Sequence, residues 1–355
     1  MPMDAERVPD DNRSMAVADQ ARYPGSALCR FLDSRLPQRS VVAEDWARRT
    51  ASAPWTPVSL PEDESRPRVG LAAEMRIGLD LADAPAYLGL LSFLPSAEYG
   101  ALLEAAGFSV DHEWAAAAGT ADPLLLEWRR AHQPIGYDIE QRAALAACLE
   151  AAGMRNIRSS FSDRPAQARR LLVAHSRSFS AQWQDEHPEA RSEREGDLDA
   201  LAHLWEGYLA HGRRQLASVG ERVILEPELG GGYGIADLVI GRCLIEVKTA
   251  FDPAAAMGDW LNQVLAYALL DWSDALGADT VAVYLGWQAL LVSESLERVL
   301  AAAVPGRSPA MEDLRADFRS AMQEDMDESY AIRMRRRYPP IITLASPALP
   351  AEPNP

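Results

Sequence analysis

Two carboxylates and one ammonium group are the side chains of this sequence whose types and spacing favour catalysis. They are Asp237, Glu246 and Lys248, within the stretch GIADLVIGRCLIEVKTA at residues 234–250. Lys248 is the only lysine of the 355-residue chain, and every other residue in its Lys+Arg count of 35 is an arginine. Carboxylates bind hard divalent cations such as Mg²⁺, and an ammonium group can transfer a proton or stabilise negative charge. The set is therefore typical of a metal-dependent catalytic site.

A β-hairpin is expected to bring these groups together. Gly241-Arg242 is the only turn signal between two apolar runs, and a two-residue turn that begins with glycine favours a type II′ hairpin. In the register that this turn sets, Asp237 lies opposite Glu246, and Lys248 lies on the same face as Glu246 because side chains alternate along a strand. The other face carries only apolar residues: Ala236, Leu238, Ile240, Cys243, Ile245 and Val247.

Paired carboxylates in such a ladder need a cation or a shared proton, because like charges that face each other destabilise a sheet. Mg²⁺, or Mn²⁺ in its place, is the cation that we expect. A structural ion pair between Lys248 and either acid is the alternative. The use of lysine here also has a chemical interpretation: desolvation can lower the pKa of an ammonium group toward neutrality, whereas arginine stays protonated.

Helical segments on either side of the hairpin supply further candidates. Over residues 197–218 the apolar stripe includes His211, which is either a buried core histidine or a metal ligand. Downstream, Gln263 and Tyr267 are i,i+4 neighbours on one face of a helix expected over 255–272. Other acids compete with His211 for the role of third metal ligand: Glu206, Glu226 and Glu228.

These residues resemble the motifs of the PD-(D/E)XK nuclease superfamily. Asp237 followed by Glu246-Val247-Lys248 matches the motif that names it, with Ala236 in place of the proline. The segment GYLAHGRRQL, with Gly207 and His211, resembles the Gly-x-x-x-His helix of the RecB-type branch. The segment NQVLAY, with Gln263 and Tyr267, resembles the Gln-x-x-x-Tyr helix of the same branch. The resemblance covers about residues 195–295, and residues 1–160 resemble no family that we can name.

The resemblance implies a restriction-endonuclease-like α/β core, with a mixed central sheet flanked by helices. It also implies hydrolysis of DNA phosphodiester bonds with Mg²⁺ or Mn²⁺, in DNA repair or in defence against foreign DNA. Metal ligands would be Asp237, Glu246, the carbonyl of Val247 and His211. The catalytic set would be Asp237, Glu246, Lys248, Gln263 and Tyr267, where the last two contact the DNA backbone or brace the lysine strand.

Other functions stay open at this point. A nuclease fold kept as a non-catalytic scaffold is one alternative, although all three charged motif residues are present, and a metal-dependent ribonuclease is another. RecB-type domains often act beside a helicase or another DNA-processing ATPase, and the chain has no Walker A sequence of its own. A helicase or ATPase is therefore the partner class that we expect besides DNA. The oligomeric state is not indicated.

The order of elements predicts two domains. Residues 22–160 are expected to form a mainly helical N-terminal domain, and residues 161–345 the nuclease-like domain. Residues 1–21 and 346–355 have the composition of disordered tails. Within the second domain the expected strands lie near residues 222–228, 235–240, 243–248, 280–285 and 288–292.

The net charge of −17 argues against a protein that coats nucleic acid by charge alone. Local basic clusters, at residues 151–180 and in the segment IRMRRRY, are either phosphate contacts or solvated faces. The arginines predicted to contact nucleic acid are Arg164, Arg169, Arg170, Arg335, Arg336 and Arg337. Three scattered cysteines indicate no disulfide framework or iron–sulfur site, and no signal peptide or membrane-spanning run is visible, so a cytoplasmic protein is expected.

Overall fold

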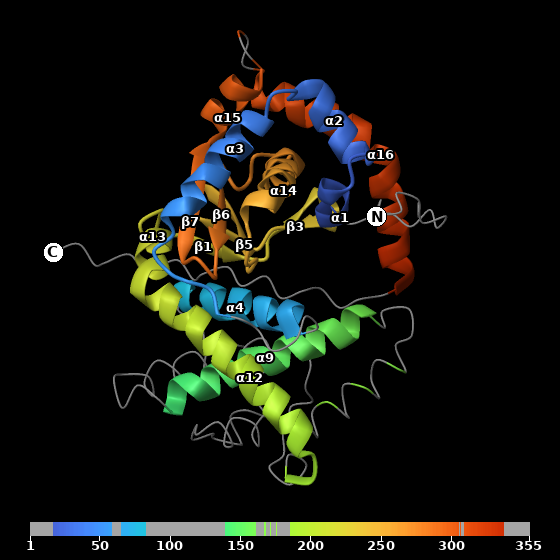
Figure 1. Ribbon diagram of the computed structural model, residues 1–355. Coiled ribbons are helices and arrows are strands. Elements are labelled where there is room, and N and C mark those ends of the chain that lie inside the picture. The colour runs from blue at the N-terminus through green and yellow to red at the C-terminus, as the bar shows by residue number, and fades with distance from the viewer. Residues whose placement is uncertain are drawn as a thin grey trace, which may run out of the picture.

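A mixed five-stranded sheet lies at the centre of the computed structural model, with helices on both of its faces (Figure 1). The structure describes residues 17–58, 65–82, 139–160, 185–304 and 309–336, together with residues 167, 171, 175 and 306. The architecture is α/β, as the sequence predicted.

The order of the strands in the sheet is β1-β4-β5-β6-β7. Strands β5 and β6 are parallel, and every other neighbouring pair is antiparallel. The helix between β5 and β6 makes the crossover that a parallel pair requires. The strands are β1 (Val223–Leu225), β4 (Leu238–Ile240), β5 (Cys243–Lys248), β6 (Thr280–Leu285) and β7 (Leu290–Ser295), and a separate pair consists of β2 (Glu228–Leu229) and β3 (Gly234–Ile235).

The β4–β5 hairpin has the predicted register, since Ile240 pairs with Cys243 across the Gly241-Arg242 turn. Gly241 has a φ of +58°, which a residue with a side chain rarely adopts, so glycine suits this turn. The predicted strand 235–240 is, however, broken at Ala236 and Asp237. Because the break interrupts the alternation of side chains, the prediction that Ala236 shares a face with Leu238 is wrong: the two belong to hydrophobic clusters on opposite sides of the sheet.

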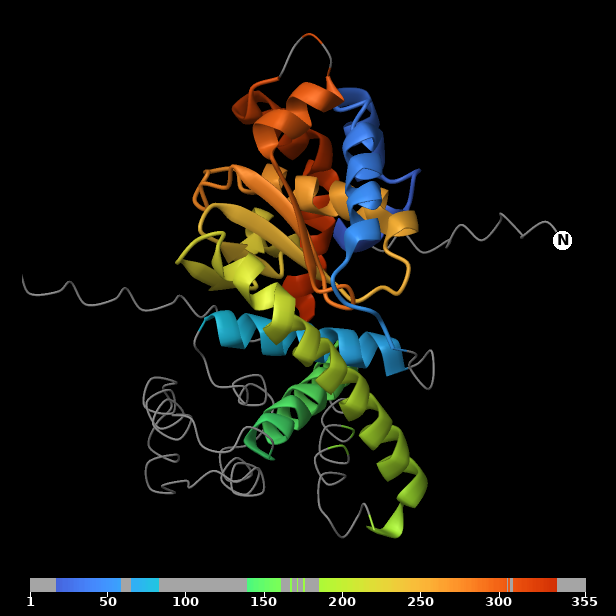
Figure 2. The ribbon, with the colours of Figure 1, turned by 60° about the vertical axis from the view of Figure 1, so that its left-hand side comes forward.

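Two groups of helices cover the two faces of the sheet (Figure 2). One face packs against α1 (Val17–Arg22), α2 (Ala27–Arg35), α3 (Ser40–Arg49), α14 (Met257–Leu270), α15 (Leu296–Ala303) and α16 (Met311–Arg336). The other packs against α4 (Ser65–Leu81), α9 (Ile139–Ser160), α12 (Pro188–Gly207) and α13 (Arg213–Ala217). In both views α4 runs between the sheet and α9. Short turns of helix complete the described elements: η1 (Thr50–Ser52), η2 (Tyr208–Gly212), η3 (Gly230–Gly232) and η4 (Ala254–Ala256).

The described N-terminal helices share their core with the sheet. Trp46 of α3 belongs to the same hydrophobic cluster as Val281 of β6, and Leu145 of α9 to the same cluster as Ile245 of β5. The two clusters therefore cross the boundary predicted at residue 160. A helix bundle with a separate core is not what the described residues form.

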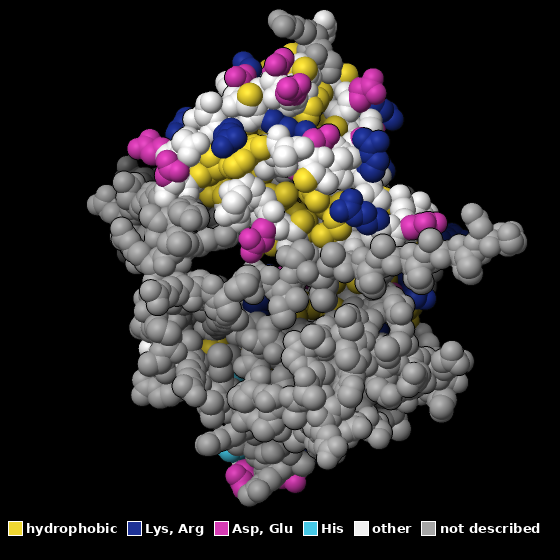
Figure 3. All heavy atoms as spheres, turned by 180° about the vertical axis from the view of Figure 1, so that it is seen from behind, with side chains coloured by type: hydrophobic (Ala, Val, Ile, Leu, Met, Phe, Trp, Pro, Cys, Tyr) yellow, Lys and Arg dark blue, Asp and Glu magenta, His cyan; other side chains and the backbone are white. Residues whose placement is uncertain are grey.

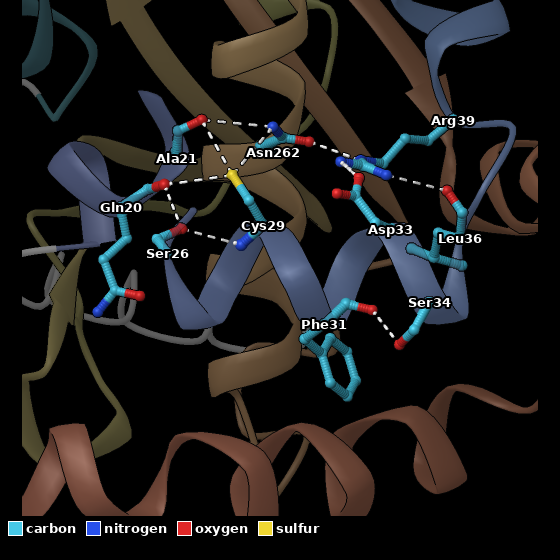
Figure 4. A network of polar contacts seen from close by, with 10 residues as sticks. All are labelled: Gln20, Ala21, Ser26, Cys29, Phe31, Asp33, Ser34, Leu36, Arg39 and Asn262. Carbon is cyan, nitrogen blue, oxygen red and sulfur yellow. Dashed lines mark hydrogen bonds and ion pairs between the residues drawn. The ribbon is translucent and has the colours of Figure 1, made fainter. Parts of the chain in front are cut away.

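Helix α1 corrects the predicted N-terminal tail. Residues 17–21 belong to this helix, and Val17 and Ala21 are buried, so the apolar burial here outweighs the polar composition of the segment. Polar contacts fix the helix (Figure 4): Asn262 of α14 donates to the carbonyl of Ala21 at 3.3 Å, and the Cys29 thiol donates to the carbonyl of Gln20 at 3.3 Å. The rest of the predicted tails, residues 1–16 and 346–355, lie outside the described residues.

Charges of both signs are interspersed on the described part of the surface seen from behind, with hydrophobic side chains between them (Figure 3). Among the described residues, no helix has the length and hydrophobicity that crossing a membrane requires.

A buried ionic cluster joins α4, α9 and α12 on one side of the sheet. Arg68 donates to Asp197 at 2.8 Å, and Arg194 pairs with Glu150 at 2.5 Å. The ring of His175 lies 3.4 Å from the second oxygen of Glu150. Burial raises the pKa of Glu150 to about 7, although Arg194 and Arg68 oppose the shift.

Replacing Glu150 with glutamine is expected to change how stability depends on pH. Because the folded-state pKa lies above the ordinary value of 4.5, the contribution of Glu150 is fully present below about pH 4.5 and is lost as the pH rises to about 7. Glu150→Gln should therefore gain on the order of 1–3 kcal/mol relative to the wild type between pH 5 and pH 8. Urea unfolding at the two pH values measures this, with exposed Glu189→Gln as the control, and a difference that does not vary with pH would contradict it.

Candidate active site

The predicted catalytic side chains converge where β4, β5 and α14 meet. Glu246 and Lys248 lie on β5, and Asp237 lies at the bend just before β4. The last residue pair of the β4–β5 ladder is Leu238 with Ile245, and Asp237 and Glu246 are the next residues beyond it. The two carboxylates lie close enough for the charge of Asp237 to raise the pKa of Glu246.

Glu246 is held by two donors on the same oxygen. Its Oε1 accepts from Lys248 Nζ at 2.5 Å and from Gln263 Nε2 at 2.7 Å. The Gln263 amide also donates to the hydroxyl of Tyr267 at 2.9 Å. Gln263 and Tyr267 are both buried, so of the two roles expected for them the contacts favour bracing the lysine strand.

Asp237 is held by the backbone. Its Oδ2 accepts from the N–H of Val247 at 2.7 Å, and its carbonyl accepts from the N–H of Glu226 at 3.0 Å. The residue that makes this contact, Val247, is also the one whose carbonyl the family resemblance implies as a metal ligand. These contacts hold the Asp237 carboxylate against β5.

The electrostatics of the site are dominated by burial and by charge pairing. Burial and the charge of Asp237 raise the pKa of Glu246 to about 8, against the effect of Lys248. Burial also raises the pKa of Asp237, although Lys248 and the Val247 N–H oppose it. For Lys248, burial acts to lower the pKa, but the charges of Glu246 and Asp237 outweigh burial and the pKa is raised. Desolvation thus acts on the pKa of Lys248 in the expected direction, but the paired carboxylates reverse the net shift.

One atom of the site lacks a partner that its burial would require. Glu246 Oε2 is buried and no N–H or O–H group of the described residues donates to it, and the side chain is 4% exposed. The side chain lies within hydrogen-bonding reach of the Asp237 carboxyl group, so the two carboxylates need a proton or a cation between them. A buried carboxylate oxygen without a partner is costly, and a hard cation is a ligand that satisfies it. The donor set thus fits Mg²⁺, although no group of three or more His, Cys, Asp and Glu among the described residues is spaced to hold a metal ion directly.

His211 lies on η2, a π-helical turn between α12 and α13. Its ring is 5.7 Å from the ring of Trp55, and Gly207 leaves room for the same indole, since a Cβ at Gly207 would lie 2.6 Å from Trp55 Cδ1. The two residues of the Gly-x-x-x-His segment thus share Trp55 as a neighbour. The ligand role of His211 stays a prediction.

Sequence reasoning missed two contributors from the N-terminal half. Arg155 of α9, a member of the predicted basic cluster, forms an ion pair with Glu226, one of the competing third acids. Burial raises the pKa of Glu74 of α4, and the charges of Asp237, Glu226 and Glu246 add to the shift. No local pattern around residue 74 signals this, because the contact depends on the long-range packing of α4 against the sheet.

The predicted nucleic-acid contacts fall at the edge of the described chain or beyond it. Arg335 and Arg336 lie in the last turn of α16, and their side chains are not described. The others lie outside the described residues: Arg164, Arg169, Arg170 and Arg337. The other competing third acids, Glu206 on α12 and Glu228 on β2, are exposed.

Comparison with protein-family models, with curated proteins and with solved structures finds no match for this chain. The resemblance to PD-(D/E)XK nucleases thus rests on the motif residues alone. The class that the structure itself defines is an α/β protein with a mixed five-stranded sheet flanked by helices. Its distinguishing feature is a buried cluster of carboxylates and one lysine beside the central strand.

Proposed function

We propose that this protein is a Mg²⁺-dependent nuclease that hydrolyses phosphodiester bonds of DNA, with Mn²⁺ as an alternative cation. The observation that carries the proposal is the Glu246 carboxylate. One of its oxygens binds Lys248 and Gln263, and the other is buried without a partner next to Asp237. A purely structural ion pair would leave no reason for a second carboxylate beside it.

The fold supports the same proposal. A mixed sheet flanked by helices is the architecture that the family resemblance implies, and a restriction-endonuclease-like core is the finer assignment that we propose. The motif residues lie on adjacent elements of this sheet, although they are separated in the sequence. Gln263 and Tyr267 lie on the helix that follows the lysine strand, as the RecB-type motif requires.

Asp237 and Glu246, with the carbonyl of Val247, are the groups that would hold Mg²⁺. When bound, the cation lowers the pKa of a water ligand and offsets the charge of the phosphate. Lys248, whose pKa is raised by the two carboxylates, stays protonated at neutral pH and stabilises the negative charge that develops on the phosphoryl oxygens. Gln263 fixes the Glu246 carboxylate, and Tyr267 fixes Gln263.

A partner is part of the proposal, because the chain is strongly acidic overall. A net charge of −17 weakens the electrostatic attraction of the chain to DNA. Binding therefore needs local clusters of basic side chains or a second protein that binds the DNA. A helicase or other DNA-processing ATPase would be that second protein, and repair or defence against foreign DNA is the setting that follows.

The proposal is tested by incubating the purified full chain with labelled linear, circular and single-stranded DNA, and with RNA, in Mg²⁺ or Mn²⁺. We expect metal-dependent cleavage of DNA that Asp237→Asn loses and that Asp313→Asn, a change of an exposed acid on α16, retains. Cleavage of the circle separates endonuclease from exonuclease action. Cleavage of RNA alone would assign a ribonuclease, and a wild type that binds no divalent cation would leave the non-catalytic scaffold as the function.

A further inference from the structure

Helix α4 presents one particular stripe of residues to the sheet. Gly70, Glu74 and Gly78 recur at steps of four, so they lie along one face of the helix. A Cβ at Gly70 would lie 2.3 Å from Thr249 Oγ1, and one at Gly78 would lie 3.2 Å from Leu225 Cδ2. The two glycines therefore let the helix lie closely against the sheet.

The positions that these glycines contact frame the candidate site. Thr249 directly follows Lys248, and Leu225 directly precedes Glu226. Gly78 also approaches Leu238, the residue after Asp237, at 3.3 Å. Glu74 lies midway between the two glycines on the stripe. Its carboxylate therefore faces the same end of the sheet as the acids of the site.

The charge balance around Glu74 is unfavourable. Burial raises the pKa of Glu74 well above its usual value, and the charges of Asp237, Glu226 and Glu246 add to the shift while Arg155 opposes it. Arg155 is already paired with Glu226. Lys248 is already paired with Glu246. The cluster thus holds more carboxylates than cations.

The backbone at Glu226 is also unusual. Its φ of +45° lies in the left-handed region, and the next residue is Pro227, which restricts the residue before it. Such a conformation is strained and persists where the surroundings impose it, as functional sites often do. The bend keeps Glu226 beside Asp237, because the N–H of Glu226 donates to the carbonyl of Asp237.

We propose that Glu74 is a cation-binding residue of this site, supplied by the N-terminal helix α4, and that it binds Mg²⁺ through a coordinated water. This inference rests on the proposed function, and it adds a residue from outside the segment that carries the family resemblance. Two independent observations support it: the placement of Glu74 by the glycine stripe, and the unpartnered buried oxygen of Glu246 in the same cluster. Contact through water agrees with the tendency of Mg²⁺ to keep several water ligands.

The proposal also assigns a role to the N-terminal half of the chain. Arg155 holds Glu226, Arg68 and Asp197 fix α4 against α12, and Asp80 at the end of α4 accepts from Tyr208 at 2.6 Å. These contacts orient α4 so that Glu74 faces the site. The N-terminal helices then form a part of the cation site and do not only cover one face of the sheet.

The test is a calorimetric titration of the full chain with Mg²⁺ in the absence of DNA. Glu74→Gln is expected to weaken Mg²⁺ binding by about tenfold or more, as the loss of an outer ligand typically does. Glu189→Gln, a change of an exposed glutamate on α12 that has no proposed role at the site, is the matched control and should bind like the wild type. Glu74→Asp keeps the charge but shortens its reach, so it should weaken binding to a smaller extent.

Thermal unfolding is measured alongside, because a fold defect would also reduce binding. Glu74→Gln removes a half-buried carboxylate that its neighbours repel, so its melting temperature should equal or exceed that of the wild type without Mg²⁺. Mg²⁺ affinity equal to that of the wild type in both Glu74 variants would overturn this inference and leave the proposed nuclease intact. A wild type that binds no Mg²⁺ would overturn both.

Discussion

Replacing Lys248 with arginine is expected to reduce DNA cleavage by about 10²–10³-fold, the range seen when one group that stabilises transition-state charge is removed. The positive charge is retained, so the loss comes from shape. The Lys248 side chain is 16% exposed, and its Nζ lies 2.5 Å from Glu246 Oε1 beside the Gln263 amide. A planar guanidinium is larger than an ammonium group, carries its charge on a wider fork and does not fit the same slot.

The expected kinetic signature is a lower single-turnover cleavage rate with Mg²⁺ affinity close to that of the wild type. Arg242→Lys, at an exposed turn residue, is the reverse exchange and should leave the rate unchanged. Full activity in Lys248→Arg would show that the site does not require a lysine, although Lys248 is the only one in the chain. Loss of Mg²⁺ binding in the variant would instead place Lys248 among the residues that organise the carboxylates.

The raised pKa of Lys248 also decides between two roles that the sequence left open. A lysine that accepts a proton from water at neutral pH needs a pKa near 7, which burial alone would favour. Here the paired carboxylates act in the opposite direction and outweigh burial. The pairing with the two carboxylates thus supports the proposed role of Lys248 in charge stabilisation and acts against one in proton transfer.

The hairpin that carries the site was predictable because its signals are local. Strand β5 has the predicted bounds, Cys243–Lys248, and the glycine of the turn set the register. The break at Ala236 was not predictable from alternation, because apolar residues continue through it. The break accompanies a side-chain contact that alternation does not predict, since the Asp237 carboxylate accepts a hydrogen bond from the N–H of Val247 on the neighbouring strand.

The remaining contributors depend on contacts across the whole chain. Glu74 lies more than 150 residues before Asp237 in the sequence, and only the packing of α4 brings it to the site. The spacing of Gly70, Glu74 and Gly78 is a signal that could have indicated a closely packed helix face, but not its partner. The π-helical turn that includes His211 was likewise hidden, because an apolar stripe with steps of three and four predicts an α-helix.

Replacing Trp46 with alanine is expected to lower the free energy of unfolding by about 3–5 kcal/mol, the usual cost of truncating a buried aromatic side chain. Trp46 of α3 is fully buried in the cluster that also holds the inner face of the sheet and α14. If the N-terminal helices were a separate domain, this loss would unfold them alone. Because the core is shared, the whole described structure should unfold earlier, in one transition.

Urea unfolding followed by far-ultraviolet circular dichroism and by tryptophan fluorescence measures this effect. Trp46→Phe is the matched control: the indole N–H of Trp46 has no hydrogen-bond partner among the described residues, so phenylalanine loses some volume but no polar contact. We expect coincident transitions by both probes, shifted to lower urea in Trp46→Ala and much less in Trp46→Phe. A small early transition followed by a second one at the wild-type midpoint would show that α1–α3 unfold independently, and the predicted division near residue 160 would then regain its support.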